Sequence, residues 1–185
     1  MSFNVVIPAR LNSSRLKEKV LIEIHGIPMV IHVAQRASLS GAKNIVIATD
    51  DKKIAEVASH YNFKSVMTNK NHLSGTDRCL EAADISMWSD QDIIVNVQAD
   101  EPLIDPALID LVAKNVTESE SGYVTACSKF KSYKEFLNPN NVKVVLDNHS
   151  HALYFSRSSI PYSSSTDLSH NNYAYHHLGI YAYRL

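Results

Sequence analysis

Four short runs of apolar residues mark the first half of the chain, and each is typical of a β-strand. The runs cover residues 3–7, 44–48, 64–67 and 93–97. Most positions within each run are apolar, so the runs lack the alternation of a strand that has one face in water. This pattern favours a parallel sheet that is buried on both faces.

Apolar residues at helical spacing follow these runs. We expect helices over residues 28–38, 52–60, 76–84 and 105–115. Pro28 suits a first helical turn, Asp50 or Asp51 suits an N-cap, and Asp105 can cap the helix that Pro106 opens. The repeated alternation of strand and helix predicts an α/β sandwich with a mostly parallel central sheet.

The second half of the chain has a different character. Strand-like runs at 123–127, 142–146, 151–155 and 179–183 are separated by polar stretches such as residues 163–167. We therefore predict a smaller mixed sheet with long loops in this half. Because no Gly-, Pro- or Ser-rich linker divides the chain, residues 1–185 are expected to form a single domain.

Charge and cysteine content narrow the class of protein. A net charge of -1 and a pI of about 6.7 argue against a nucleic-acid-binding face, which needs a clustered basic excess. The apolar runs are too short to insert into a membrane, and the first residues lack the pattern of a secretory signal. Cys79 and Cys127 lie far apart in apolar segments and are interpreted as buried, reduced thiols. We expect a cytoplasmic protein.

The loop after the first strand is a candidate phosphate site. Residues 8–19 read PARLNSSRLKEK, and the basic and hydroxyl side chains among them are Arg10, Ser13, Ser14, Arg15, Lys17 and Lys19. Arginine can hold phosphate oxygens through paired hydrogen bonds, and hydroxyl groups add further donors. A solvated basic loop is the alternative. The glycine patterns of P-loop and dinucleotide-binding proteins do not occur, which disfavours both classes.

Two carboxylates follow the most strand-like run of the chain. Residues 96–105, NVQADEPLID, place Asp100 and Glu101 beyond the end of that strand, where open parallel sheets bind their ligands. A carboxylate in this position suits Mg²⁺, which takes one or two carboxylates together with substrate phosphates. The alternative is that both residues shape a turn before Pro102.

The segment SGTDR at residues 74–78 combines groups that can recognise a base or a ribose. By itself it is a weak signal. Ser74 or Thr76 can equally cap a helix, and Asp77 and Arg78 can form an exposed ion pair of little energetic consequence.

Residues 154–162 and 176–184 contain polar groups suited to a sugar acid. Arg157 can pair with a carboxylate, and His177 and Tyr181 can donate to hydroxyl groups. Packing roles at strand edges are the alternative for the last two. The nine histidines lack the cysteine or acidic partner spacing of a zinc site, and neither cysteine lies in a hydrolase signature.

Six segments in order, IPARLNSSRL, SGTDR, NVQADEPLI, FLNPNNVKVV, YFSRSSIPY and HLGIYAYR, resemble the signature segments of the 3-deoxy-manno-octulosonate cytidylyltransferases (CMP-Kdo synthetases). The resemblance implies a nucleotide-diphospho-sugar transferase-like three-layer sandwich and a homodimer. It also implies Mg²⁺-dependent reaction of CTP with 3-deoxy-manno-octulosonate (Kdo), which gives CMP-Kdo and pyrophosphate for lipopolysaccharide biosynthesis.

The resemblance also implies roles for individual residues. The nucleotide side comprises Arg10, Ser13, Arg15, Lys19, Arg78 and Gln98. The sugar side comprises Gln98, Arg157, His177 and Tyr181, and Asp100 is the metal ligand. Arg10, Arg15, Lys19 and Asp100 are the expected catalytic residues. The sequence departs from the family at Lys17-Glu18, where Pro-Gly is usual, and at Ala99, where Gly is usual.

Members of this family continue beyond the segment HLGIYAYR, so we expect the cytidylyltransferase domain to be incomplete at its C-terminus. Two alternatives remain open at this point. One is a cytidylyltransferase for another acidic sugar, such as a sialic acid. The other is a truncated, non-catalytic protein that binds a nucleotide or another subunit.

Overall fold

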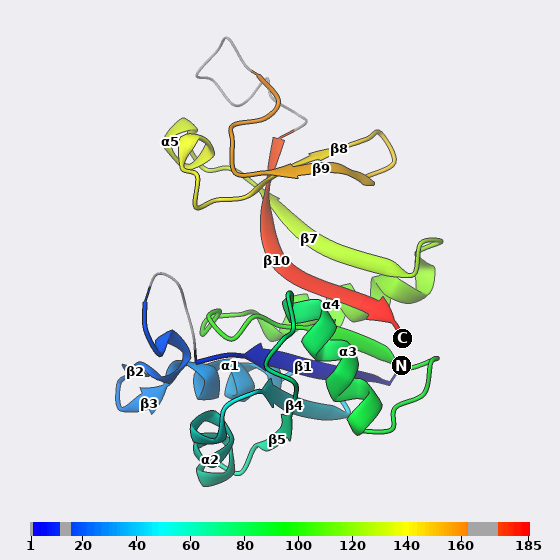
Figure 1. The fold of residues 1–185 in the computed structure, drawn as a ribbon. Coiled ribbons are helices and arrows are strands. Elements are labelled where there is room, and N and C mark those ends of the chain that lie inside the picture. The colour runs from blue at the N-terminus through cyan, green and yellow to red at the C-terminus, as the bar shows by residue number, and fades with distance from the viewer. Residues whose placement is uncertain (1, 12–15, 163–173) are drawn as a thin grey trace. The chain divides into compact units, whose positions relative to one another are not determined.

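A computed structural model of the chain describes residues 2–11, 16–162 and 174–185 (Figure 1). Contacts divide the chain into two units, Met1–Val124 with Ile180–Leu185, and Thr125–Gly179. The strands β7 (Tyr123–Lys129) and β10 (Ala174–Arg184) have residues in both units. The prediction of one domain over residues 1–185 stays a prediction.

The first unit is built on a parallel sheet. Its strands are β1 (Phe3–Ala9), β4 (Asn44–Thr49), β5 (Lys64–Met67) and β6 (Ile93–Asn96). They lie in the order β5-β4-β1-β6, and the last residues of β10 pair with β6 in the antiparallel sense. The four strands predicted for this half are confirmed, and so is the mostly parallel sheet of an α/β fold.

Four helices connect these strands or follow them. They are α1 (Met29–Ala37), α2 (Lys52–His60), α3 (Gly75–Ile85) and α4 (Pro106–Glu118). Asp51, rather than Asp50, caps α2 by accepting the Lys53 N–H at 2.8 Å. Asp105 caps α4 as expected and accepts the Ala107 N–H at 3.0 Å. Each predicted helix is therefore present. The place expected for Pro28 is wrong, because Pro28 ends β3 and precedes α1, whose first turn has no side-chain cap.

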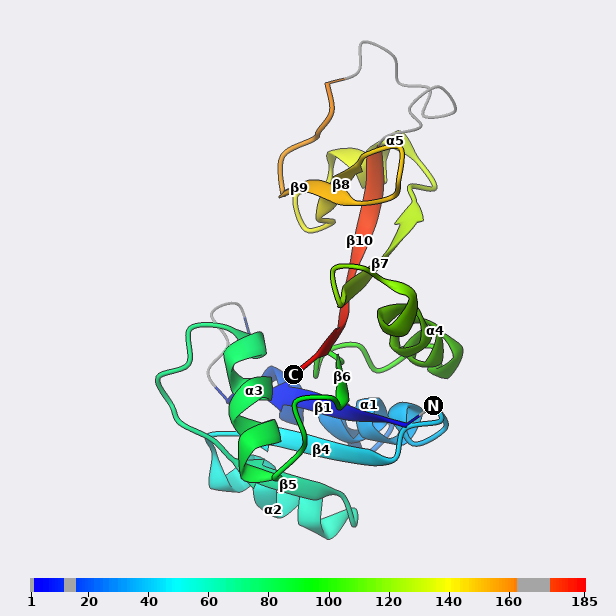
Figure 2. The ribbon, with the colours of Figure 1, turned by 90° about the vertical axis from the view of Figure 1, so that its right-hand side faces the viewer.

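Both faces of the parallel sheet are buried. Alternate strand residues, among them Val6, Val46 and Ile94, form one buried cluster with Cys79 and Ala82 of α3. The residues between them point to the opposite face, and Val5, Ile7, Ile47 and Val95 are also fully buried. The connections from β1 through α1 to β4, and from β4 through α2 to β5, run in the same direction across the sheet, and right-handed crossovers place both helices on that second face. The chain reverses direction across the sheet after β5. Figure 2 shows α3 on the other side of the strands from α1 and α2.

Short elements that the apolar pattern does not predict lie between β1 and α1. They are a 3₁₀ turn, η1 (Lys19–Leu21), and a small hairpin of β2 (Glu23–Ile24) and β3 (Ile27–Pro28). At the turn of the hairpin, His25 and Gly26 have positive φ angles of 51° and 77°. Glycine tolerates this conformation without steric cost, which explains its position here.

The strands of the second unit continue the same sheet, with antiparallel pairing of β8 (Lys143–Leu146) to β9 (Ala152–Ser156) on one side and to the first residues of β10 on the other. The short helix α5 (Tyr133–Leu137) begins at Ser132, whose side chain accepts the Glu135 N–H. With β7 pairing to β10, the strands predicted for this half are present. The polar stretch 163–167 lies outside the described residues.

Cys79 is buried and Cys127 is half-buried, and both are free thiols. Burial raises the pKa of the Cys79 thiol to about 12. Burial of Cys79 was predicted, whereas the burial expected for Cys127 is only partial. Among the described residues, no helix is long and apolar enough to cross a membrane.

Candidate active site

The carboxyl ends of the four parallel strands meet at one edge of the first unit, because parallel strands run in the same direction. Polar side chains follow each of these ends: Arg10 after β1, Asp50 after β4, Thr68 after β5, and Gln98 and Asp100 after β6. This edge is where open α/β sheets bind their ligands. Three of these residues, Arg10, Gln98 and Asp100, were predicted as site residues from the sequence.

The loop after β1 is described only in part. Arg10 is exposed at the end of the strand. Ser13 and Arg15, both predicted to bind phosphate, lie outside the described residues. Lys19 begins η1 and reaches Asp100, with its Nζ atom 2.6 Å from the carboxylate Oδ2 atom. The structure thus brings together a predicted phosphate ligand and the predicted metal ligand.

The Lys19–Asp100 pair is open to solvent. The two side chains are 36% and 43% exposed, and an ion pair in that environment contributes little to stability. Next to it, burial and the Asp100 charge raise the pKa of the Glu101 carboxyl, while Lys19 lowers it. Because both partners of the Lys19–Asp100 pair are exposed, a ligand can separate them at small cost.

Both departures from the family pattern have a clear local conformation. Glu18 stands where glycine is usual and adopts the left-handed conformation, with φ of 54°. Its carboxylate accepts from Lys53 Nζ at 2.8 Å. Ala99 is buried and is not one of the described residues with positive φ. The backbone at Glu18 therefore has the left-handed conformation that glycine favours, whereas the backbone at Ala99 does not.

The start of α3 is fixed by a capping box. The Ser74 side chain accepts the Asp77 N–H, and the Asp77 carboxylate accepts the Ser74 N–H in return. The capping role considered for Ser74 is confirmed. The exposed Asp77–Arg78 ion pair considered for this segment is wrong, because Asp77 is used by the cap and Arg78 is buried.

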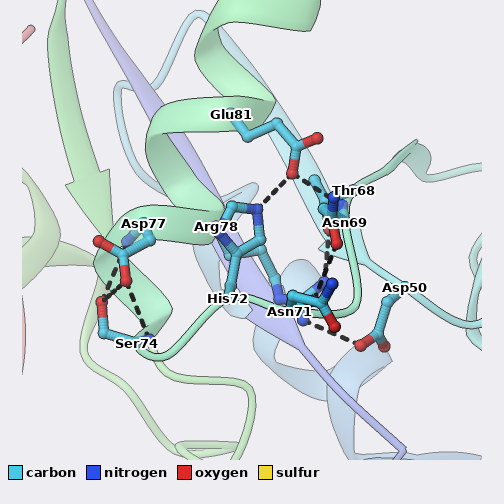
Figure 3. Close-up of polar contacts among 9 residues, drawn as sticks. All are labelled: Asp50, Thr68, Asn69, Asn71, His72, Ser74, Asp77, Arg78 and Glu81. Atoms are coloured by element: carbon cyan, nitrogen blue, oxygen red, sulfur yellow. Dashed lines mark hydrogen bonds and ion pairs between the residues drawn. The ribbon is translucent and has the colours of Figure 1, made fainter.

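Arg78 is enclosed by residues from three elements. Its side chain is 3% exposed; Nη1 donates to Thr68 Oγ1, and Nη2 donates to Asp50 Oδ2 at 3.0 Å. Figure 3 shows the guanidinium of Arg78 between α3 and the ends of β4 and β5. Arg78 thus joins α3 to the carboxyl edge of the sheet, although two of its nitrogens are already engaged by the protein.

The first residue of α3 lies against two neighbouring strands. A side chain at Gly75 would meet Pro8 Cγ at 3.4 Å and Asn96 Nδ2 at 4.0 Å. Gln98, in turn, donates to Asn96 Oδ1 at 3.3 Å. The ends of β1 and β6 and the start of α3 therefore converge, as expected if the segments next to them contact one ligand.

Tyr181 belongs to the part of β10 in the first unit. In the register of β10 and β6 it stands opposite Asn96, and its ring lies 5.9 Å from that of Tyr123. Burial raises the pKa of its hydroxyl group. The structure places Tyr181 beside the last residue of β6, the strand that leads to Gln98 and Asp100.

Arg157 and His177 lie in the second unit. Arg157 is exposed and donates to the Pro139 carbonyl oxygen at 3.0 Å. His177 is buried, with Nε2 2.9 Å from Thr125 Oγ1 and its ring against that of Phe155. Burial lowers the pKa of His177, and the nearby His176 lowers it further. These contacts support the packing role for His177 that the sequence left open, while the Arg157 guanidinium keeps donors for a ligand.

Lys143 is a functional candidate that sequence reasoning missed. It is fully buried, and its ammonium group donates to the carbonyl oxygens of Asn138 at 2.7 Å and Arg157 at 3.2 Å. Lys143 thereby fixes the backbone on which Arg157 stands. Its place in the segment FLNPNNVKVV was the only signal, because a lysine in a strand otherwise suggests an exposed position.

Metal-ligating side chains are sparse in the described part of the chain. No group of three or more His, Cys, Asp or Glu side chains is arranged there to hold an ion. Mg²⁺ commonly needs only one or two protein carboxylates, because water and substrate phosphates complete its shell. Asp100, exposed at the strand end beside a basic loop, fits that donor set.

The fold and the composition of this edge define a nucleotidyltransferase-like α/β protein. A solved structure of CMP:2-keto-3-deoxy-manno-octonic acid synthetase complexed with CTP matches with a TM-score of 0.86 and 37% identity, over 100% of this chain and 74% of that one. The cytidylyltransferase family profile matches residues 4–185.

Curated relatives give the more specific assignment. The 3-deoxy-manno-octulosonate cytidylyltransferase of Serratia proteamaculans is 44% identical, over 100% of this chain and 76% of its own length. That of Methylibium petroleiphilum is 45% identical, over 100% of this chain and 73% of its own length. The chain belongs to the family of 3-deoxy-manno-octulosonate cytidylyltransferases, which confirms the resemblance seen in its sequence.

Proposed function

We propose that this protein transfers the cytidylyl group of CTP to Kdo and releases pyrophosphate. The observation that carries the proposal is the match to enzymes of that name along the whole chain. The convergence of the predicted nucleotide segments at the carboxyl edge of the sheet supports it. The structural relative, solved with CTP, supports the choice of nucleotide.

In the proposed reaction, the anomeric hydroxyl oxygen of the sugar attacks the α-phosphorus of CTP. A bond forms between that oxygen and phosphorus, the bond from phosphorus to the pyrophosphate oxygen breaks, and the hydroxyl proton is released. Such a transfer depends mainly on positioning and on neutralising charge. Arg10 and Lys19 are assigned to the leaving phosphates, with Ser13 and Arg15 of the same loop. Arg78 and Gln98 are assigned to the nucleoside.

Asp100 is the proposed ligand for Mg²⁺. A bound Mg²⁺ would neutralise charge that develops on the phosphate oxygens. Lys19 Nζ lies 2.6 Å from Asp100 Oδ2, so a metal ion held by Asp100 would compete with Lys19 for the carboxylate. When phosphates are bound, Lys19 has an alternative anionic partner, which leaves Asp100 open to the metal.

The remaining assignments rest on the family resemblance. The resemblance assigns Arg157, His177 and Tyr181 to the sugar, with the Arg157 guanidinium as the partner of its carboxylate, whereas the contacts of His177 favour a packing role. A homodimer in the cytoplasm, supplying CMP-Kdo for lipopolysaccharide biosynthesis, belongs to the same proposal.

Pyrophosphate release from CTP, Kdo and Mg²⁺ tests this function. We expect release with Kdo and much slower release with a sialic acid or with ATP as the nucleotide. Asp100→Asn should lower turnover by about 100-fold or more, because it removes the charge that holds the metal. The matched control is Asp105→Asn, since asparagine also caps a helix and turnover should stay near wild type. Full activity of Asp100→Asn would overturn the metal assignment, and release with sialic acid alone would reassign the substrate.

A further inference from the structure

The ends of β4 and β5 converge on the guanidinium group of Arg78. In the register of these strands, Thr49 pairs with Met67, and the Thr68 N–H donates to the Thr49 carbonyl oxygen at 2.8 Å. Asp50 follows β4 and Thr68 follows β5, and each of them accepts one hydrogen bond from Arg78. Two adjacent strand ends therefore supply one acceptor each.

A second set of contacts also connects α3 to this edge of the sheet. Glu81, one turn further along α3, accepts the Asn69 N–H at 2.8 Å and contacts the ring of His72. In Figure 3 these contacts lie on the same side of α3 as those of Arg78. Because of these two attachments, the segment of residues 69–74 has a defined path, whereas a polar loop of this composition is ordinarily mobile.

This held segment leads directly into the candidate nucleotide site. It ends at Ser74, whose side chain caps α3, and the following Gly75 approaches Pro8 of β1 and Asn96 of β6. If α3 moved relative to β4 and β5, Gly75 would also move relative to the ends of β1 and β6, which lead to Arg10 and Gln98. The Arg78 contacts thus set the geometry on which the site depends.

Stability alone is a weak reason for this arrangement. Taking a guanidinium and a carboxylate out of water costs about as much as their attraction returns, and well-packed apolar residues often stabilise a protein as much. Arg78 is 3% exposed and Asp50 is 17% exposed. A buried charge pair does, however, fix orientation, since breaking either partner leaves an uncompensated charge.

We propose that Asp50 and Thr68 are positioning residues for the nucleotide: they hold Arg78, and through it the start of α3, in the arrangement that binds CTP. This inference rests on the proposed function, because it presupposes a nucleotide at the carboxyl edge. Neither residue touches the reacting atoms in this account. Their effect passes through Arg78.

The test is calorimetric binding of CTP and Mg²⁺ to four single variants of the full chain and one double variant. Asp50→Asn keeps the size of the side chain and removes its charge, and Thr68→Val removes the acceptor alone. We expect CTP to bind about tenfold more weakly to the first and about threefold more weakly to the second. In turnover assays, the KM for CTP should rise in the same proportion while kcat stays within about twofold.

Asp51→Ala is the matched control for stability. Asp51 is adjacent to Asp50, but its side chain accepts the Lys53 N–H and caps α2, so its loss should lower the thermal unfolding midpoint and leave CTP affinity unchanged. The fourth variant, Arg78→Lys, is combined with Asp50→Asn. If Asp50 acts through Arg78, the combined loss of affinity is smaller than the product of the two single losses.

The outcomes separate this inference from the function on which it rests. A wild-type chain that does not bind CTP overturns the proposed function, and the inference with it. If the wild type binds CTP but Asp50→Asn and Thr68→Val bind it as well as Asp51→Ala does, Asp50 and Thr68 have no positioning role. Multiplicative losses with Arg78→Lys also contradict the proposal, because Asp50 would then act independently. Should Asp50→Asn fail to fold, Thr68→Val decides the question.

Discussion

Among the residues that the structure describes, each unit contains one buried arginine or lysine, and the two are held in different ways. In the first unit, Arg78 donates to the carboxylate of Asp50 and to the hydroxyl of Thr68. In the second, Lys143 donates to two backbone carbonyl oxygens and lies 5.9 Å from the centre of the Phe136 ring. The Arg78 charge is balanced by the opposite charge of Asp50, whereas the Lys143 charge is stabilised by the dipoles of two carbonyl groups.

This difference has electrostatic consequences. Among the described residues, no carboxylate forms an ion pair with Lys143, and burial together with the Arg157 charge lowers the pKa of its ammonium group. Lys143 orders the backbone near Arg157 without committing a second side chain. Arg78 instead couples three separate elements and leaves Asp50 dependent on it. The two cations should therefore respond differently when each is removed.

Replacement of each cation by methionine gives the largest expected effects. Arg78→Met leaves the Asp50 carboxylate partly buried without a counterion, and we expect the free energy of unfolding to fall by about 3 kcal/mol. Lys143→Met leaves two neutral carbonyl oxygens unpaired, which should cost about 1 to 2 kcal/mol. Urea unfolding of both variants measures these values. Equal losses, or a larger loss for Lys143→Met, would contradict the distinction between the two cations.

The second unit should also be sensitive to acid. Burial lowers the pKa values of His176 and His177 from the ordinary 6.5. Below pH 6.5 the unfolded chain therefore takes up protons before the folded chain does, so this contribution to stability falls until the pH passes the lowered pKa. His177→Gln keeps a polar partner for Thr125 and should reduce the loss measured by urea unfolding between about pH 7 and 5. An unchanged loss would show that His177 does not contribute.

An exposed ion pair in the first unit should show the smallest effect. Lys53 and Glu18 pair at 2.8 Å, with side chains 56% and 35% exposed. We expect Lys53→Met to change the free energy of unfolding by less than about 0.5 kcal/mol, because solvent screens such a pair. The same urea series provides the measurement. A cost as large as that of Arg78→Met would mean that burial does not explain the behaviour of Arg78.

Local patterns were sufficient to predict most of the fold. Helix α2 has its predicted bounds, because an apolar stripe over residues 52–60 coincides with a capping residue at Asp51. The hairpin of β2 and β3 and the helix α5 were not predicted, since each is too short to show a period. Strand β10 begins at Ala174 rather than near Gly179, because the polar residues His176 and His177 obscure its start.

The site was predictable where it follows strand ends, and less so where it depends on distant contacts. Arg10 and Asp100 could be identified from their positions after β1 and β6, and Gln98 from the family resemblance. The burial of Arg78 could not, because its partners are 10 and 28 residues away in sequence. Lys143 was missed for a similar reason: the carbonyl groups that compensate its burial belong to Asn138 and Arg157, on segments that only the fold brings together.

The most direct test of the central claim is ³¹P NMR of CTP, Kdo and Mg²⁺ incubated with the protein. We expect the three triphosphate signals to decline together, while one phosphodiester signal and the pyrophosphate signal grow in equal molar amounts. An unchanged triphosphate spectrum would contradict the proposed function. A phosphomonoester signal in place of the phosphodiester would contradict it as well, because water rather than the sugar would then be the attacking group.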